Sequence, residues 1–520
     1  MWKRVNNCLI GVSEIAHGNY NPADYPNIHF KTFKKHGKDV AIFDGSFYTT
    51  SYLRRMGYNA PSFEETYHYP GFKVPMAHQR ETVKFFLDHP RCFCCNGLGT
   101  GKTLSAFWAA ECLRGLGQIR RVLVVAPKSA MRNAWESTII STCPGIKFVV
   151  LRGDRRQKIA ACMDVSNTYI IVNPESLHII KDSLPEVDLV IADESTKFKT
   201  WKAQRTQALN YIALQRRVWL MTGTPAPQAP TDAYAQIRIL RGGKYMSFTA
   251  FRDKTMYQIN KFRWKAKSVA TKVVSDEMQP CIRFSRDECL DLPDLAVIDY
   301  KVPLSEQQKK VVKQLQDQAL ALIDGEVVTA VNAATVLSKC LQALTGVVYG
   351  NTDNDGERQE VPVDSTELFE AVGDIVDQSE QPVLIYVAYR SSVKAMLDYF
   401  AKDGVPVAGI TADTTVDERT EIFEKIQSGE LKVMVAVAQT VAHGITLTNA
   451  NTIVWLTPPM SFETYDQANG RIYRKGQTRK CTIYRVYQDW VTRLLLKRLD
   501  ERTELQNTLL EILSKKDVDI

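Results

Sequence analysis

A glycine-rich stretch at residues 96–103, with the sequence NGLGTGKT, restricts the fold more than any other part of the chain. Its glycines allow several backbone N–H groups to turn inward, where they can surround phosphate oxygens. Lys102 would reach the β- and γ-phosphates, and the hydroxyl of Thr103 would bind Mg²⁺. Such a loop joins a buried strand to a helix, whose N-terminal dipole adds positive potential. The expected ligands are ATP and Mg²⁺, with ATP contacts from Gly97, Gly99, Thr100, Gly101, Lys102 and Thr103.

Asn96 departs from the strict phosphate-loop pattern, which has glycine five residues before Gly101. A glycine-rich turn with an unrelated lysine is therefore the alternative interpretation. Upstream, Gln79 lies at the start of a predicted helix. Its amide has the donor and the acceptor needed to read an adenine edge, so we count it among the ATP contacts.

Two acidic residues follow a predicted strand, as a nucleotide site requires. Residues 189–192 are apolar and lead directly into Asp193 and Glu194. One carboxylate, assigned to Asp193, can hold Mg²⁺, and the next can orient and deprotonate the attacking water. A solvated loop with adjacent acids is the alternative, which the presence of Lys102 upstream makes weaker. Residues 222–225, TGTP, are predicted to form a tight turn whose hydroxyls sense the acid pair.

A second set of phosphate contacts is predicted near the other end of the chain, where residues 467–477 read QANGRIYRKGQ. Gln467, Arg471 and Arg474 are four and three residues apart, which would place them on one face of a helix. The planar, permanently charged guanidinium group binds phosphate oxygens bidentately. A surface helix with scattered arginines is the alternative, but the two glycines of this stretch disfavour an ordinary helix. We predict catalytic roles for all three side chains and ATP contacts for both arginines.

Two series of short apolar runs indicate an α/β fold with two domains. Runs rich in Val and Ile, without polar alternation, are typical of strands buried on both faces of parallel sheets. Ligands bind at the carboxyl ends of such strands. The first series is residues 122–126, 169–172, 189–192 and 218–221, and the second is residues 383–387, 433–437, 452–456 and 481–486.

The same patterns predict three parts in the chain. Residues 1–70 lack the strand–helix alternation and are expected to form a small accessory domain, for which DNA binding is one interpretation. Residues 71–300 would form the first lobe, with an insertion near 243–280. Residues 301–520 would form the second lobe, which starts with linking helices and ends with a C-terminal helix. The predicted linking helices are residues 304–323 and 331–344, residues 350–356 are a turn-rich surface loop, and the last helix is residues 490–513.

Composition limits the function without selecting one. The chain has 66 Lys and Arg against 58 Asp and Glu, which gives a net charge of +8 and permits nucleic-acid binding without requiring it. Eleven cysteines are present and only those at residues 92–95 cluster, but no second Cys/His pair lies at zinc-ligand spacing. Cys92 and Cys94 are expected to be buried strand residues. We expect free thiols, a reducing cytoplasm, no secretory signal and no membrane span.

Together these motifs resemble those of superfamily-two helicases, and in particular their Swi/Snf-type branch. The similarity covers roughly residues 71–500, and the motifs occur in the expected order. The closing Gly-Gln of the arginine motif is also shared with this branch. The matching stretches are residues 97–103 (motif I), 127–129 and 133–136 (motif Ia), 193–196 (motif II), 222–225 (motif III), 442–447 (motif V) and 467–477 (motif VI).

The resemblance implies two RecA-like lobes, ATP hydrolysis stimulated by DNA, and translocation along duplex DNA. Motif V implies that Gly444 contributes to the ATP site, while we assign no catalytic role to His443. Thr196 stands where the family usually has His, which leaves the contact between motifs II and III open. The compact sequence is more similar to phage or bacterial members, including branch-migration and fork-remodelling enzymes, than to chromatin remodellers.

A protein that tracks along DNA needs repeated phosphate contacts from loops at strand ends, without base reading. A local backbone cap is the alternative role for each loop Ser or Thr. The candidates are Lys128, Ser129 and Asn173 in the first lobe and Arg390, Thr440 and Thr446 in the second.

Residues 261–267, KFRWKAK, interleave aromatic and positively charged side chains. This mixture suits phosphate contact combined with stacking on a base or wedging at a junction, with Arg263 and Trp264 as candidates. The alternative is a surface hairpin whose Phe262 and Trp264 face the core while the cations face water.

The leading hypothesis from the sequence is an ATP-driven translocase on double-stranded DNA that remodels branched DNA in replication, recombination or repair. One alternative is a helicase that separates DNA or RNA strands. Another is a nucleotide-gated DNA-binding recruitment factor with little turnover. We expect a monomer whose partner is duplex or branched DNA and whose protein partners are unknown. The expected location is the cytoplasm of a bacterial or phage-infected cell, or the nucleus in a eukaryote.

Overall fold

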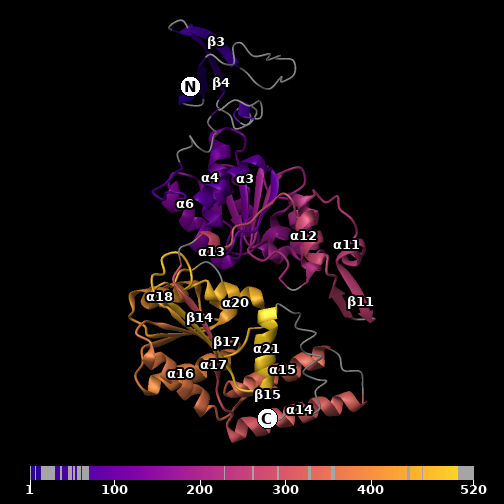
Figure 1. The fold of residues 1–520 in the computed structure, drawn as a ribbon, viewed down its shortest axis with the longest axis vertical. Helices are drawn as coiled ribbons and strands as arrows, with labels where there is room; N and C mark the ends of the chain where they lie inside the picture. Colours follow the sequence, from indigo (N-terminus) through magenta and orange to yellow (C-terminus); the bar gives the residue numbers. More distant parts are fainter. Residues whose placement is uncertain are drawn as a thin grey trace. The chain divides into compact units, whose positions relative to one another are not determined.

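A computed structural model describes residues 2–5, 8–12, 30–35, 38–44, 50, 53–54, 60, 69–227, 229–260, 263–289, 292–325, 330–352, 358–441, 445–459 and 461–501 of the chain. The chain forms two compact units (Figure 1). The first unit comprises Met1–Gly223, Ala233–Thr255 and Lys267–Phe284. The second comprises Thr224–Asp232, Met256–Ala266 and Ser285–Ile520.

Within the described residues of the first unit, seven parallel strands form a sheet in the order β13-β5-β10-β9-β6-β8-β7. Every residue of β6, β8 and β9 is buried, because apolar side chains cover both faces of these strands. The strands are β5 (Arg91–Cys94), β6 (Val122–Val125), β7 (Phe148–Val150), β8 (Tyr169–Val172), β9 (Leu189–Asp193), β10 (Arg217–Met221) and β13 (Cys281–Ile282).

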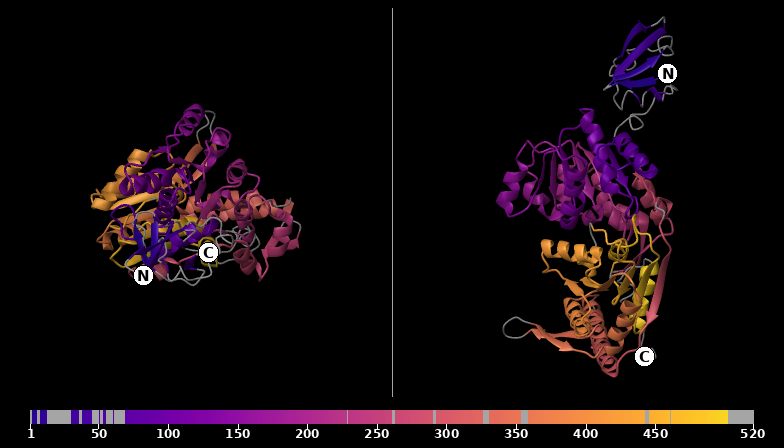
Figure 2. Two further views of the ribbon diagram at one scale, coloured as in Figure 1. Left: turned by 90° about the horizontal axis from the view of Figure 1, so that it is seen from above. Right: turned by 90° about the vertical axis from the view of Figure 1, so that its left-hand side faces the viewer.

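Helices pack on this sheet and supply its core (Figure 2). Phe86 of α3 and Trp108 of α4 are fully buried in one cluster with β5, β6 and β9. The helices are α3 (Ala77–Asp88), α4 (Lys102–Gly115), α5 (Lys128–Ala130), the π-helical turn η2 (Met131–Glu136), α6 (Ser137–Thr142), α7 (Arg155–Cys162), η3 (Pro174–Ser176), α8 (Leu177–Ile180), η4 (Ser195–Phe198), α9 (Gln204–Ile212), η5 (Pro230–Ala233), α10 (Tyr234–Leu240), α11 (Phe248–Thr255) and α12 (Ala270–Glu277).

The N-terminal segment contributes an antiparallel sheet of a different kind. Among its described residues, β1 (Trp2–Val5), β2 (Cys8–Val12), β4 (Lys38–Asp44) and β3 (Phe30–Lys35) are neighbours in that order. All the pairings are antiparallel. The expected accessory domain over residues 1–70 and its DNA-binding role stay predictions.

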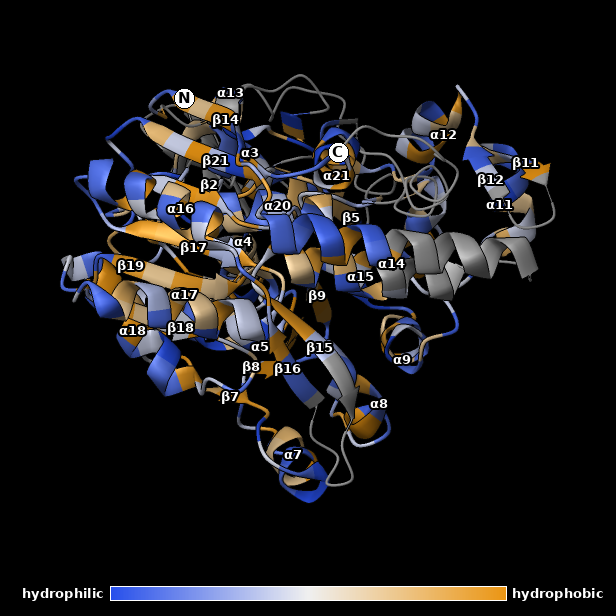
Figure 3. Cartoon of the chain, turned by 90° about the horizontal axis from the view of Figure 1, so that it is seen from below, coloured by the Kyte–Doolittle hydropathy of each residue, from blue (hydrophilic) through white to orange (hydrophobic). Residues whose placement is uncertain are grey.

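The second unit contains another parallel sheet. In the described part of this unit, six strands follow the order β14-β21-β20-β17-β19-β18. Figure 3 shows hydrophobic colouring along the central strands β17 and β19, whereas α17 and α18 carry hydrophilic residues. The strands are β14 (Leu295–Lys301), β17 (Val383–Val387), β18 (Val407–Ile410), β19 (Val433–Val437), β20 (Thr452–Trp455) and β21 (Cys481–Tyr487).

Helices and two hairpins complete this unit. The hairpin strands are β11 (Met256–Asn260) with β12 (Arg263–Ala266), and β15 (Val347–Thr352) with β16 (Arg358–Pro362). The helices are α13 (Arg286–Cys289), α14 (Glu306–Gly325), α15 (Ala330–Leu344), α16 (Thr366–Gln378), α17 (Arg390–Lys402), α18 (Val416–Ser428), α19 (Ala438–Val441), α20 (Phe462–Asn469) and α21 (Trp490–Glu501).

The α/β class with two parallel sheets confirms the prediction from the apolar runs. All eight predicted runs are strands, and the two linking helices correspond to α14 and α15. The edge strands β7, β13, β14 and β18 were missed, and most residues of β14 are exposed. Edge strands need fewer apolar side chains, so their sequence signal is weaker. Of the predicted loop at 350–356, residues 350–352 belong to β15 and the rest lie outside the described residues.

The expected domain limits at residues 70 and 300 stay a prediction. The boundary after residue 300 falls near the end of β14, which pairs in parallel with β21. In the described ranges, no helix is both long enough and apolar enough to cross a bilayer.

Arg485 ties three elements of the second unit together, and its removal should destabilise that unit. From β21, its Nε donates to Asp299 of β14 at 2.6 Å and its Nη1 to Asp500 of α21 at 2.5 Å. Because the guanidinium is buried, Arg485→Met should lower the free energy of unfolding by about 1–3 kcal/mol in urea denaturation followed by circular dichroism. Lys425→Met, which removes an ion pair at the surface of α18, is the control and should change the midpoint little. Equal midpoints for both variants would contradict this role.

Candidate functional site

The carboxyl ends of three strands in the first unit lie in register. Met221 of β10 pairs with Cys94 of β5 on one side and with Asp193 of β9 on the other. The residues that follow these strands are the phosphate loop, the acidic pair and the turn at Thr222 and Gly223. The sheet therefore brings the predicted motifs I, II and III to one edge, although they are widely separated in the sequence.

The phosphate loop has a backbone that requires glycine at two positions. Gly99 and Gly101 have φ angles of 79° and 83°, in the left-handed region. A Cβ atom on Gly101 would lie 2.2 Å from Nε2 of Gln79. Helix α4 starts directly afterwards, at Lys102, so its first N–H groups face the loop. This glycine cradle at a helix N-terminus fits a triphosphate.

Lys102 is buried and holds the loop from within. Its Nζ donates to the backbone O of Asn96 at 2.8 Å and to that of Gly97 at 3.1 Å. The hydroxyl of Thr100 also donates to the O of Gly97, at 2.9 Å. Thr103 is half-buried in the first turn of α4. Carbonyl oxygens thus stand in for the phosphate oxygens that Lys102 would contact when a nucleotide is bound.

Gln79 is in contact with the loop. It is 4% exposed, and its Nε2 donates to the O of Thr100 at 3.2 Å while its Oε1 accepts from the N–H of Met76 at 3.0 Å. His78, beside it, bonds to the same Thr100 oxygen at 2.9 Å through Nε2. Both side chains therefore support the phosphate loop, and an adenine contact of Gln79 stays a prediction.

Asn96, the residue that departs from the phosphate-loop pattern, has a structural role that the sequence did not reveal. It is 1% exposed, and its Nδ2 donates to the hydroxyl of Thr82 in α3 at 2.9 Å. Its Oδ1 accepts from the N–H of Phe284 at 2.9 Å, and the N–H of Gly97 donates to the O of Phe284 at 2.8 Å. The last residue of the first unit is thus hydrogen-bonded to the phosphate loop.

The acidic pair is held in two different ways. Asp193 is buried, and its Oδ2 accepts from the indole Nε1 of Trp135 at 2.9 Å, while its Oδ1 accepts from the N–H of Glu194 at 3.1 Å. Burial raises the pKa of Asp193, against the opposing effects of the Trp135 hydrogen bond and the positive charge of Lys102. Glu194 has a left-handed φ of 51° and a half-buried side chain. A buried carboxylate near a lysine fits a Mg²⁺ ligand.

The residues after this pair lie within the fold. The hydroxyl of Ser195 donates to Oε1 of Gln236 in α10 at 2.7 Å, and Thr196 is 4% exposed. Gly223 approaches the phosphate loop, because a Cβ on it would lie 3.7 Å from the O of Asn96. The turn of motif III therefore contacts motif I directly.

In the second unit, the predicted helix through Gln467, Arg471 and Arg474 is wrong. Helix α20 ends at Asn469, and Gly470 caps it, so both arginines lie in the turns that follow. Gln467 is buried and its Nε2 donates to Oε1 of Glu463 at 3.2 Å. The glycine that disfavoured a surface helix is the residue at which this helix stops.

The two arginines nevertheless converge. Nη1 of Arg471 and Nη1 of Arg474 both donate to the O of Ile445, at 2.9 Å and 2.7 Å. Arg471 also caps α20, because its Nε donates to the O of Gln467 at 2.9 Å. Burial, together with the positive charge of Arg286, lowers the pKa of Arg474. Two guanidinium groups within one small region form a site suited to phosphate oxygens.

Arg286 is a further cation in this region, and the sequence analysis missed it. Its Nη2 lies 3.4 Å from Oδ1 of Asp466, and its guanidinium carbon lies 5.7 Å from the ring centre of Tyr473. It occurs far from the arginine motif in the sequence and has no pattern of its own. Only the tertiary structure brings it to Arg474.

The candidate DNA contacts of the first unit differ in exposure. Lys128 is exposed and Ser129 half-buried at the start of α5, immediately after β6. Asn173 is 3% exposed, its Nδ2 donates to Glu175 at 3.0 Å, and its Oδ1 accepts from the hydroxyl of Ser176 at 2.8 Å. These bonds agree with the alternative of a local cap, and a phosphate contact of Asn173 stays a prediction.

The candidates of the second unit flank strand ends. Arg390 begins α17 after β17, is exposed, and pairs with the exposed Asp413. The hydroxyl of Thr440 donates to the O of Val437 at 2.7 Å, as a local cap does, whereas Thr446 is exposed. Gly444 lies outside the described residues. Arg390 and Thr446 are thus accessible, and their DNA contacts stay predictions.

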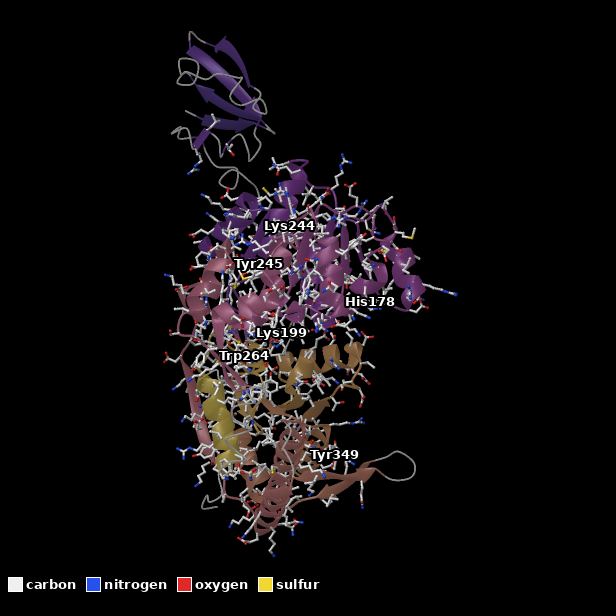
Figure 4. The ribbon with its side chains drawn as sticks, turned by 90° about the vertical axis from the view of Figure 1, so that its right-hand side faces the viewer. His178, Lys199, Lys244, Tyr245, Trp264 and Tyr349 are labelled. Atoms are coloured by element: carbon white, nitrogen blue, oxygen red, sulfur yellow. The ribbon has the colours of Figure 1, made fainter. Side chains whose placement is uncertain are left out.

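The aromatic and basic segment forms a hairpin. Trp264 of β12 (Figure 4) pairs with Gln258 of β11 and is half-buried, and Lys265 beside it is exposed. Arg263 belongs to β12, while Lys261 and Phe262 lie outside the described residues. The hairpin geometry is common to both interpretations of this segment, so its role at a junction stays a prediction.

Comparison with known proteins shows the family. A model of the SNF2-related domain matches residues 78–345, and a model of the helicase conserved C-terminal domain matches residues 367–476. The chain belongs to the family of proteins with an SNF2-related domain. Its motif order, predicted from the sequence, agrees with this assignment.

Individual relatives are distant and longer. The chain is 22% identical to a Xenopus tropicalis SWI/SNF-related matrix-associated actin-dependent regulator of chromatin subfamily A-like protein 1, over 79% of this chain and 42% of that protein. It is 23% identical to Arabidopsis thaliana ATP-dependent DNA helicase DDM1, over 79% and 58%. It is 24% identical to Homo sapiens DNA repair and recombination protein RAD54-like, over 80% and 63%. The chain thus spans about two fifths to two thirds of the length of these relatives.

Among solved structures, the chain matches the Sulfolobus solfataricus SWI2/SNF2 ATPase core in complex with dsDNA. The match has a TM-score of 0.41 and 19% sequence identity. It covers 83% of this chain and 92% of the other.

Replacing Asn96 should destabilise the first unit even where the replacement restores the usual loop residue. Asn96→Ala and Asn96→Gly both remove the bonds to the hydroxyl of Thr82 and to the N–H of Phe284, of which the first is buried, so each should cost about 1–3 kcal/mol in urea denaturation. Asn451→Ala removes a more exposed side chain–backbone bond and serves as the control. An Asn96→Gly variant as stable as the wild type would contradict this role.

Asp193→Asn should stabilise the protein without Mg²⁺ or nucleotide. The pKa of Asp193 is higher in the folded protein than in the unfolded chain. The stability that the protonated carboxyl group contributes is therefore fully present below the pKa of the unfolded state, and it is lost as pH rises through the pKa of the folded state. Asn does not ionise, and its oxygen can still accept the Trp135 hydrogen bond; the accompanying loss of the bond from the N–H of Glu194 does not depend on pH. Thermal melts in EDTA should therefore show a higher midpoint for the variant, with a difference that grows as pH rises. A difference that does not change with pH would contradict burial as its cause.

Proposed function

We propose that this chain is an ATP-driven motor that moves along double-stranded DNA and remodels branched DNA. The observation that carries the proposal is the register of β5, β10 and β9, which brings Lys102 and Asp193 to one sheet edge. A phosphate cradle with a buried carboxylate suits Mg²⁺-dependent phosphoryl transfer. Family membership and relatives named as an ATP-dependent DNA helicase and a DNA repair and recombination protein support this choice.

The residues of the first unit divide the chemistry between them. Gly99 and Gly101 would let backbone N–H groups surround the phosphates, and Lys102 would leave its carbonyl partners to bind the γ-phosphate. Asp193 and Thr103 would hold Mg²⁺, which neutralises charge on the phosphate oxygens when bound. Glu194, held by its left-handed backbone beside Asp193, would orient and deprotonate water.

The second unit supplies guanidinium groups for the developing negative charge. Arg471 and Arg474 donate to one carbonyl, that of Ile445, so a phosphate would replace a single shared acceptor. The guanidinium group of arginine stays charged at neutral pH, as this role requires. We propose that both act as arginine fingers, because their guanidinium groups converge on the carbonyl oxygen of Ile445.

DNA would be held mainly by its phosphates. Lys128 and Ser129 at the end of β6, and Arg390 and Thr446 at strand ends of the second sheet, are accessible to a backbone. Contacts of this kind do not read sequence, which suits movement along duplex. Remodelling of branches, as in branch migration or fork reversal, is the finer part of the proposal and depends on the β11–β12 hairpin.

A single ATPase titration tests the proposal. Purified protein is assayed against single-stranded, duplex, forked and four-way DNA, and against RNA, with Glu194→Gln as the matched control. Duplex and four-way DNA should stimulate hydrolysis, and Glu194→Gln should bind ATP but lower turnover by at least about 10²-fold. Stimulation by single strands or RNA with unwinding of simple duplexes would favour a strand-separating helicase. Negligible turnover on every substrate would favour a nucleotide-gated recruitment factor.

A further inference from the structure

A π-helical turn separates the two halves of the helix that follows β6. The chain runs from α5 through η2 (Met131–Glu136) into α6 without leaving helical geometry. π-Helical turns are rare, because each inserts a residue into the α-helical hydrogen-bond pattern, and they often occur at functional sites. Here the extra residue changes the helical phase over the very segment that contains Trp135.

Trp135 points into the core from this turn. It is fully buried in the cluster that also contains Trp108 and Trp219. The indole groups of Trp108 and Trp219 donate to backbone oxygens, of Pro70 at 3.0 Å and of His89 at 3.2 Å. The indole of Trp135 instead donates to the carboxylate of Asp193 at 2.9 Å. A buried tryptophan needs some acceptor, and this one is paired with the acidic residue of motif II.

The carboxylate of Asp193 is therefore held at both oxygens. Oδ2 accepts from Trp135, and Oδ1 accepts from the N–H of Glu194 at 3.1 Å. Rotation of the carboxylate would break one bond or the other inside a buried environment, where an unpaired polar group is costly. Each oxygen retains further acceptor capacity, so both bonds are compatible with a bound cation.

We propose that Trp135 is a positioning residue that orients the carboxylate of Asp193 for Mg²⁺. This inference rests on the proposed function, because it takes Asp193 as the ligand of the Mg²⁺ that accompanies ATP. In this role Trp135 would not contact the cation. Its hydrogen bond would fix the orientation of the carboxylate plane and thereby the direction of the oxygens that bind Mg²⁺. Hydrogen-bond partners of metal ligands typically change metal affinity by about 10–100-fold when removed.

The test measures Mg²⁺ dependence rather than activity. Binding of an N-methylanthraniloyl derivative of ATP to the full chain is followed by fluorescence while Mg²⁺ is titrated. Trp135→Phe should raise the Mg²⁺ concentration at half-maximal binding by about 10-fold or more, and leave binding in EDTA unchanged. Trp108→Phe is the matched control, because it truncates a tryptophan of the same core that donates only to a backbone carbonyl.

Three outcomes decide between the interpretations. An unchanged Mg²⁺ dependence in Trp135→Phe, or an equal shift in Trp108→Phe, overturns the positioning role. If Trp135→Phe melts far below Trp108→Phe, a second variant with the benzothienyl analogue of tryptophan at position 135 is used. This analogue keeps the shape of the side chain and removes only the N–H. It should show the same shift in Mg²⁺ dependence. Absence of Mg²⁺-dependent nucleotide binding in the wild type contradicts the proposed function itself.

Discussion

The pairing of Met221 with both Cys94 and Asp193 is the constraint on which the candidate site depends. Parallel strands place their carboxyl ends at the same edge, so a register set by buried apolar residues also sets the positions of the polar residues that follow. A slip of one strand would turn its side chains to the opposite face and carry the acidic pair away from the phosphate loop. The packing of the first sheet's core therefore also determines the positions of the candidate catalytic residues at its edge.

The same edge also carries the end of the first unit. Phe284 is hydrogen-bonded to Asn96 and Gly97, and Arg286, two residues later, pairs with Asp466 and lies over the ring of Tyr473 in the second unit. Asn96 in place of the usual small residue makes sense in this light, because glycine or alanine would supply neither of its two side-chain bonds.

Much of the architecture follows from local pattern. Runs such as residues 383–387 and 433–437 contain enough Val and Ile to be recognised as buried strands, and Gly99, Gly101 and Lys102 carry a spacing with a direct chemical meaning. Spacing alone was misleading at Arg471 and Arg474. Their helical spacing predicted a continuous helix, but the helix ends at the glycine before Arg471. At Asn173, spacing does not choose between a local cap and a phosphate contact, because a polar residue after a strand can form either.

The sequence by itself determined the order of strands and helices, the phosphate-binding character of residues 96–103 and the chemical types available for catalysis, because these depend on neighbouring residues and short periods. The tertiary structure decided which of them meet. The bond from Trp135 to Asp193, the bonds of Asn96 to Thr82 and Phe284, and the sharing of Ile445 by two arginines join residues that are far apart in the chain. Such contacts depend on the register of strands, on the helical phase after a π-turn and on the residue at which a helix ends. A short sequence motif specifies none of these three.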